Sequence, residues 1–264
     1  MYNQSLPRRI PNCSSMLSKR PRFPYEALSA EDLEEILCKC GILSPCECPT
    51  GKEIKEEDVI CQGGTGADMK EWVRLMVNNF SFPHIKVLYP TAPLQPYTPA
   101  GEQMSNVWFD RADISPDAPE KLDSLANIEV EVKNLIKKEN DAGIPSNRII
   151  IGGFSMGGAL SYHSAYRWDR NIAGAFAFSS FLNHDSVVYN DLKKATGARL
   201  PPLLQIHGDS DELVYLEWGQ ETHNKLKELG VQGELHIMER LGHSLNKRGM
   251  KIIKEWIDKH LPEI

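Results

Sequence analysis

The sequence predicts an α/β protein with a mostly parallel, twisted β-sheet that carries helices on both faces. From about residue 57, short apolar segments of strand length alternate with longer segments in which apolar residues recur at helical spacing. Strands that alternate with helices form βαβ units, and such units build parallel sheets covered on both faces. We therefore predict one domain over residues 57–264, with residues 1–56 outside it.

The first 56 residues differ in composition from the rest. Residues 1–25 carry basic side chains, no acidic ones, and prolines that would break an amphipathic helix. This favours a disordered basic tail over a mitochondrial transit peptide. Ser29-Ala-Glu-Asp32 resembles a capping box and predicts a short helix that ends near Gly41.

A cysteine-rich loop follows that helix. Cys38-Lys-Cys40 and Cys46-Glu-Cys48 bring four thiols close together in the sequence. Zinc sites usually separate paired ligands by two or more residues, so we interpret this segment as a loop with reduced thiols and not as a metal site. Because no secretory signal precedes these cysteines, we expect a cytoplasmic protein.

The elements of the predicted domain follow one another in order. Strands are expected at 85–89, 148–151, 174–178 and 203–207, with a weaker strand at 234–238. Apolar residues from Leu122 to Leu135 line one face of a long helix that ends near Gly143. A last helix surrounds residues 253–257. In parallel sheets, reactive groups lie at the carboxyl ends of the strands.

Charge and hydropathy exclude several function classes. The chain has 30 Lys and Arg against 36 Asp and Glu, a net charge of −6, which argues against nucleic acid as a partner. No apolar run approaches the length of about 20 residues that a membrane span requires. We expect at most peripheral contact with membranes.

One motif stands at the end of a predicted strand. Gly153-Phe-Ser-Met-Gly157 directly follows strand 148–151 and opens a helical segment. In a nucleophile elbow, this context lifts the serine hydroxyl out of the sheet at a helix N-terminus whose amides favour negative charge. The pattern indicates that Ser155 is a nucleophile and not an incidental serine in a glycine-rich turn.

A serine nucleophile needs a histidine base and a carboxylate that orients it. These partners follow the serine in the order acid, then histidine. His243 lies in the predicted loop before the last helix and is the candidate base. The turn after strand 203–207 offers both Asp209 and Asp211, and spacing alone leaves both open because aspartate also stabilises turns.

Acyl transfer also needs two backbone N–H donors for the developing oxyanion. Met156, directly after the nucleophile, is expected to supply one. The other should come from a loop after an early strand, and Cys61–Gly66 is the glycine-rich candidate. This loop lacks the endings of phosphate-binding loops, so we expect no nucleotide site there.

Stretches spread along the chain resemble a single family. They are His84–Pro93, Asn106–Arg111, Gly143–Arg148, Ile151–Gly158, Ser179–Asn183 and His207–Val214. From about Val59 to the C-terminus, the chain resembles the acyl-protein thioesterases, and among them the branch called lysophospholipase-like protein. The resemblance implies the α/β-hydrolase fold and a reaction that needs neither a metal nor an organic cofactor.

The resemblance also assigns roles residue by residue. The nucleophile falls on Ser155, the base on His243, and the acid on Asp211, the second aspartate of the family's H-G-x-x-D pattern. The oxyanion donors fall on the amides of Met156 and Gln62. The family's triad is therefore complete in this chain.

The segment before the oxyanion loop departs from the family. Its members have an apolar strand that ends in His-Gly, whereas Glu56–Gly66 keeps only Val59 and Ile60 of that strand and lacks the His-Gly pair. Loss of one oxyanion donor lowers turnover about 10²–10³-fold in known hydrolases. The sequence thus leaves open a weakened acyl-binding protein.

The resemblance implies a serine hydrolase that most closely matches palmitoyl-protein hydrolases. The alternative is a carboxylesterase or lysophospholipase that acts on small acyl esters. The expected partners are S-acylated proteins or small esters. Apolar residues near the motif are candidates for acyl binding, although the same residues suit an ordinary core: Trp108, Phe109, Phe154, Phe181 and Leu182.

Overall fold

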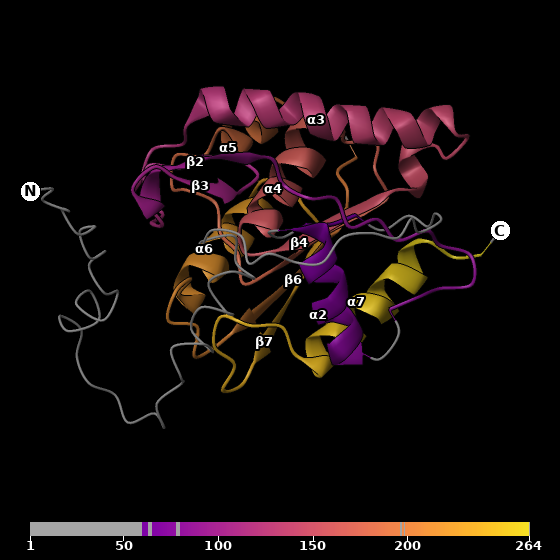
Figure 1. Cartoon of the computed structure of the whole chain (residues 1–264). Coiled ribbons are helices and arrows are strands. Elements are labelled where there is room, and N and C mark those ends of the chain that lie inside the picture. The colour runs from indigo at the N-terminus through magenta and orange to yellow at the C-terminus, as the bar shows by residue number, and fades with distance from the viewer. Residues whose placement is uncertain (1–59, 63–64, 78–79, 196, 198, 264) are drawn as a thin grey trace, which may run out of the picture.

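A computed structural model describes residues 60–62, 65–77, 80–195, 197 and 199–263. The predicted tail, the short helix and the cysteine-rich loop lie outside these residues. The centre of the fold is a five-stranded parallel sheet in the order β1-β4-β5-β6-β7 (Figure 1). Its strands are β1 (Ile60–Gln62), β4 (Ile150–Phe154), β5 (Gly174–Phe178), β6 (Leu203–Gly208) and β7 (Gly233–Met238).

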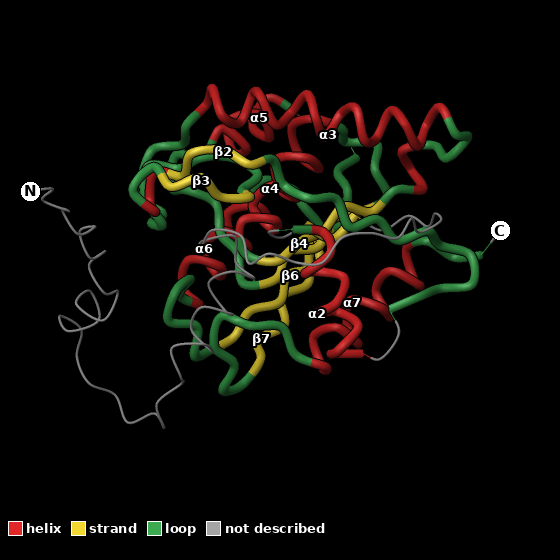
Figure 2. The backbone as a smooth tube through the Cα atoms, in the orientation of Figure 1, coloured by secondary structure: helices red, strands yellow, loops and turns green. Residues whose placement is uncertain are grey.

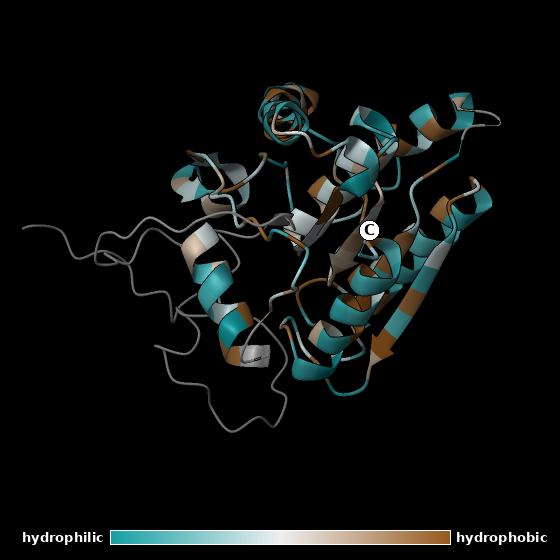
Figure 3. Cartoon of the chain, turned by 90° about the vertical axis from the view of Figure 1, so that its right-hand side faces the viewer, coloured by the Kyte–Doolittle hydropathy of each residue, from teal (hydrophilic) through white to brown (hydrophobic). Residues whose placement is uncertain are grey.

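Helices cover both faces of this sheet (Figure 2). On one face lie α3 (Leu122–Asp141), α4 (Met156–His163), α5 (Val187–Lys194) and α6 (Leu216–Glu228). On the other face, α2 (Gly66–Val77) packs beside α7 (Lys247–His260). Along these helices hydrophilic and hydrophobic residues alternate, as amphipathic packing requires (Figure 3). The predicted α/β-hydrolase architecture is confirmed.

Strand side chains divide between two core clusters according to their position along each strand. Ile151, Ala175 and Ala177 belong to the cluster on the α4 side, whereas Ile150 and Phe176 belong to the cluster on the α2 and α7 side. This alternation follows from the two-residue period of a β-strand. Because both faces are buried, the strands read as continuous apolar runs in the sequence.

A small hairpin lies outside the main sheet. Strands β2 (Leu94–Tyr97) and β3 (Gln103–Asn106) pair antiparallel around a short 3-10 turn, Thr98–Ala100, with Gly101 in the left-handed region at φ 69°. Asp110 accepts hydrogen bonds from the Thr98 N–H and hydroxyl, both at 2.8 Å. These bonds fix the loop after β3 over the sheet edge that carries the candidate site.

Of the strand predicted at residues 85–89, the structure describes a single bridge position at Leu88 and no continuous strand. Pro83 and Pro90 flank it and supply no N–H for strand pairing. Ile85 is nevertheless buried in the core cluster between the sheet and helices α2 and α7. A short apolar run indicates burial, but it does not show that the backbone has a paired neighbour.

Candidate active site

Ser155 lies at the sharp turn between β4 and α4. Its backbone has φ 54° and ψ −119°, a strained conformation for a residue with a side chain. The turn is held by the Ser155 N–H, which donates to the Phe178 carbonyl at 2.8 Å, and by the Gly158 N–H, which donates to the Ser155 carbonyl at 3.0 Å. The predicted strand, turn and helix around this serine are therefore present.

Glycines allow the turn to be this tight. A Cβ on Gly153 would lie 2.4 Å from the carbonyl carbon of Gly157, and a Cβ on Gly158 would lie 2.6 Å from that of Ser180. Both distances are shorter than any real carbon contact. The motif's glycines thus let the start of α4 approach β4 and β5, which sets the position of Ser155.

His243 and Asp211 meet at the ends of neighbouring segments. The imidazole Nδ1 lies 2.9 Å from Asp211 Oδ2 and 3.1 Å from Oδ1, and both side chains are buried. The N–H groups of Val214 and Leu213 donate to Oδ1 at 2.9 and 3.1 Å. With Nδ1 protonated and donating to the carboxylate, Nε2 of His243 is the nitrogen left to act as a base.

The same imidazole lies beside the elbow. Its ring centroid is 4.7 Å from that of Phe154, the residue directly before Ser155. Burial alone would raise the pKa of Asp211, but the hydrogen bond and charge of His243, with the Val214 N–H, outweigh it and hold the pKa below its usual value. The acid therefore stays ionised and fixes the imidazole at neutral pH.

Asp209 and the other histidines occupy different positions. Asp209 accepts hydrogen bonds from the Arg240 N–H at 2.6 Å and from the Ser210 hydroxyl, as a turn residue does. His163 lies 3.3 Å from Glu120, away from the elbow. His207 contacts the Val214 carbonyl at 2.8 Å and lies 3.7 Å from Asp211, so it packs behind the carboxylate.

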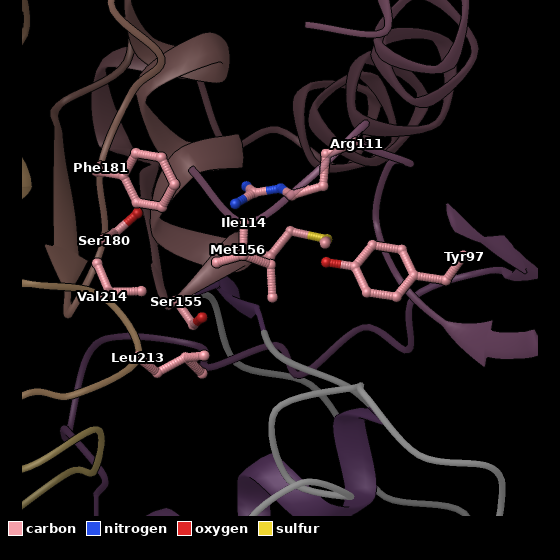
Figure 4. Close-up of a pocket in the computed structure, with 9 residues that line it drawn as sticks. All are labelled: Tyr97, Arg111, Ile114, Ser155, Met156, Ser180, Phe181, Leu213 and Val214. Carbon is pink, nitrogen blue, oxygen red and sulfur yellow. The ribbon is translucent and has the colours of Figure 1, made fainter. Parts of the chain in front are cut away.

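A small cavity opens beside Ser155 (Figure 4). Its volume is about 20 Å³, close to what one water molecule needs. The lining residues come from the hairpin and its following loop, the elbow, and the ends of β5 and β6: Tyr97, Arg111, Ile114, Ser155, Met156, Ser180, Phe181, Leu213 and Val214. The cavity therefore has both polar and apolar walls next to the nucleophile.

The five residues predicted to bind an acyl chain lie in different parts of the structure, and only one of them lines the cavity. Phe181 lines the cavity. Trp108, Phe109 and Leu182 are buried in the core cluster on the α4 side, and Phe154 is buried on the opposite side of the sheet. Sequence reasoning missed Tyr97 and Arg111 as lining residues. Arg111 ends the stretch Asn106–Arg111 that resembles the family, but nothing in that stretch indicated its place beside Ser155.

The two predicted oxyanion donors lie on adjacent elements. Met156 is the first residue of α4. Gln62 is the last residue of β1, where it pairs in register with Gly153 of β4. The strand Ile60–Gln62 is thus retained despite the unusual sequence before it, and it ends beside the elbow. The role of Gln62 as a donor stays a prediction.

Over the described part of the chain, no group of three or more His, Cys, Asp or Glu side chains is arranged to hold a metal ion. Among the helices that the structure describes, none has the length and apolar character needed to cross a bilayer.

The sequence of this chain is similar to those of known proteins. Residues 47–261 match the profile of the phospholipase/carboxylesterase family. Lysophospholipase-like protein 1 of Mus musculus is 47% identical over 201 residues, which are 76% of this chain and 84% of that protein. Acyl-protein thioesterase 1 homolog 1 of Dictyostelium discoideum is 33% identical over 213 residues, 78% of this chain and 91% of that protein.

Solved structures agree with this relationship. The acyl-protein thioesterase 2 of Zea mays superimposes with a TM-score of 0.66 at 25% identity, covering 80% of this chain and 97% of that one. Arabidopsis thaliana SOBER1 gives a TM-score of 0.65 at 26% identity, over 76% of this chain and 96% of that one. The chain belongs to the phospholipase/carboxylesterase family and is a hydrolase with the α/β-hydrolase fold.

Proposed function

We propose that this protein is a serine hydrolase that removes short acyl groups from thioesters or esters through Ser155, His243 and Asp211. The observation that carries the proposal is the strained Ser155 turn beside an imidazole that is hydrogen-bonded to Asp211 at 2.9 Å. A nucleophile, a base and an orienting acid in this order define the reaction class.

The reaction has two steps. His243 Nε2 takes the proton of the Ser155 hydroxyl as Oγ attacks the acyl carbonyl, and the amides of Met156 and Gln62 donate to the oxyanion. The intermediate collapses to an acyl-enzyme, and the imidazolium returns its proton to the leaving thiolate or alkoxide. Water, deprotonated by the same imidazole, then releases the carboxylic acid and restores Ser155.

The substrate class follows from the relatives and from the cavity. Proteins named acyl-protein thioesterases and lysophospholipase-like protein are among the relatives, which supports S-acylated proteins or lysophospholipid-like esters as substrates. A cavity of about 20 Å³ beside the nucleophile favours short acyl groups over a palmitoyl chain. We therefore rank short acyl thioesters and esters first.

Hydrolysis of a chain-length series tests this proposal. Hydrolysis of acyl thioesters and esters with two to sixteen carbons is measured for the wild type and for Ser155→Ala. We expect Ser155-dependent turnover that falls with chain length.

Asp211→Asn should lower kcat about 10²–10⁴-fold, because it stabilises the wrong imidazole tautomer. Asp209→Asn is the matched control, since Asp209 accepts bonds from the Arg240 N–H and the Ser210 hydroxyl and none from His243.

Labelling by a fluorophosphonate separates an enzyme from an acyl-binding protein. A competent triad should be labelled at Ser155, and the label should be lost in Ser155→Ala. If the wild type takes up no label and hydrolyses no ester, the atypical segment before the oxyanion loop has left a binding protein, and the proposal is wrong.

A further inference from the structure

The cavity beside Ser155 contains a buried positive charge. Arg111, in the loop after β3, is only 8% exposed, and its guanidinium lines the cavity (Figure 4). Its Cζ lies 5.1 Å from the ring centre of Phe109 and 5.4 Å from that of Phe181. The aromatic faces hold the guanidinium in place but supply no counter-ion.

This guanidinium makes no hydrogen bond or ion pair within the described part of the chain, and its Nε is fully buried. The carboxylate of Glu120 attracts the guanidinium through space, but it directly contacts His163 at 3.3 Å and the Val187 N–H at 3.0 Å. Arg167, by contrast, pairs directly with Asp191 at 3.0 Å. A buried guanidinium without a hydrogen-bonded partner is costly, so this cation fits an anionic ligand.

Two neutral donors share the cavity with Arg111. The Ser180 Oγ is buried and has no hydrogen-bond partner among the described residues. The Tyr97 hydroxyl points toward Met156 in the cavity (Figure 4). Two hydroxyls and a guanidinium therefore line the same cavity as the apolar Leu213 and Val214.

We propose that Arg111, with Tyr97 and Ser180, forms an anion subsite that selects substrates with a negatively charged oxygen group close to the scissile carbonyl. The inference rests on the proposed hydrolase function and names its substrate class. The guanidinium fork matches carboxylate and phosphate groups alike. The small cavity favours a carboxylate at the end of a short acyl group over a phosphate in the leaving group.

Matched pairs of esters test the subsite. In the acyl arm, mono-p-nitrophenyl glutarate is compared with p-nitrophenyl pentanoate; in the leaving-group arm, 1-butyrylglycerol 3-phosphate is compared with 1-butyrylglycerol. Background hydrolysis of each ester, measured without enzyme, is subtracted before the kcat/KM values are compared. We expect the wild type to favour the anionic ester at least tenfold in the acyl arm, and Arg111→Met to lower this ratio roughly 10–100-fold, the range for a charge-assisted hydrogen bond.

Controls keep the test independent of folding. Arg170→Met removes a guanidinium that donates to the carbonyls of Tyr166 and Asp191 outside the site, so it should keep the wild-type ratio. Ser180→Ala and Tyr97→Phe should each lower the ratio about threefold or more, as loss of a single neutral hydrogen bond does. The wild-type ratio decides the question even where Arg111→Met fails to fold.

The outcomes separate this inference from the proposed function. A preference only in the leaving-group arm that Arg111→Met abolishes keeps the anion subsite and assigns it to a phosphate. Ser155-dependent turnover without an anionic preference in either arm, or an equal loss of both esters of a pair in Arg111→Met, overturns the subsite alone. Absence of Ser155-dependent turnover of every ester overturns the proposed function itself.

Discussion

On β5 and β6, side chains that point to opposite faces of the sheet differ in kind. Toward α2 and α7 the strands present large apolar residues, among them Phe176, Phe178 and Ile206. Toward α4 and α6, apart from Leu203, they present small or polar ones: Ala175, Ala177, Gln205 and His207. Gln205 donates to the Gly219 carbonyl of α6 at 2.7 Å, and His207 would contact a Cβ on the same glycine at 2.3 Å.

The contrast shows how the fold divides stability from function. Large side chains on the α7 face bury much apolar area and make it a stabilising core. Small side chains on the α4 face let the elbow approach the strands, and polar side chains there surround the candidate triad. Because the two faces share the same strands, a substitution on either face tests whether this division holds.

The largest effect is expected on the α7 face. Trp256 is 5% exposed, stacks on His260 at 4.1 Å between ring centres, and covers Gly174. Trp256→Ala should lower the free energy of unfolding by about 3–5 kcal/mol, because it leaves a cavity in an aromatic core. Ester turnover per folded molecule should stay near the wild-type value. Urea unfolding and active-site titration with a fluorophosphonate measure the two quantities.

Leu160→Ala in α4 provides the comparison on the other face. Leu160 is fully buried, and its truncation should cost about 2–5 kcal/mol. Here turnover should fall as well, because α4 carries the elbow. If Trp256→Ala lowers turnover per folded molecule as strongly as Leu160→Ala does, the division between the faces is wrong.

A second test uses two adjacent glycines of β4 that face opposite ways. A Cβ on Gly153 would lie 2.4 Å from the backbone of Gly157 in the elbow, whereas one on Gly152 would lie 2.1 Å from the ring of Phe176. Gly153→Ala should lower kcat/KM about 10²-fold or more, since small displacements of reacting groups are costly. Gly152→Ala should cost about 1–3 kcal/mol of stability through overpacking.

Kinetics and thermal unfolding of both variants decide this test. The comparison predicts that Gly152→Ala retains a kcat/KM within severalfold of the wild type once the folded fraction is counted. Equal losses of activity in the two variants would mean that the aromatic face also positions Ser155.

The sequence predicted the fold well where the signal is local. Strands 148–151, 174–178 and 203–207 are apolar runs bounded by turns, and each corresponds to a strand within three residues of its bounds. The strand at 85–89 is reduced to one bridge position at Leu88, because burial of Ile85 produces the same apolar pattern without a continuous strand. Pairing depends on distant residues, which no local pattern records.

The candidate site was likewise predictable from the sequence where it depends on a local motif, and not where it depends on contacts between distant residues. Ser155 follows from one contiguous motif, but Asp209 and Asp211 are equivalent in the sequence, and only the resemblance chose between them. The structure brings Asp211, and not Asp209, to His243. Arg111 went unnoticed because its role arises from contacts with Phe109 and Phe181, which only the folded chain brings together.

The smallest effect concerns pH and the buried histidines of the α4 and α6 face. Burial lowers the pKa values of His163, His207 and His223 below their ordinary value of 6.5. In the unfolded chain these groups bind protons as the pH falls through 6.5, while in the folded protein they stay neutral until a lower pH. Stability is therefore complete above pH 6.5 and decreases as the pH falls toward the folded-state values.

His223 isolates one of these contributions. It is 8% exposed, Lys227 adds to the lowering of its pKa, and it lies in α6 against Gly233. His223→Gln removes the titrating group, so the decrease in Tm between pH 7.5 and 5.5 should become smaller than in the wild type. If the wild type and His223→Gln show the same pH dependence of Tm, keeping His223 neutral in the folded protein does not reduce stability at low pH.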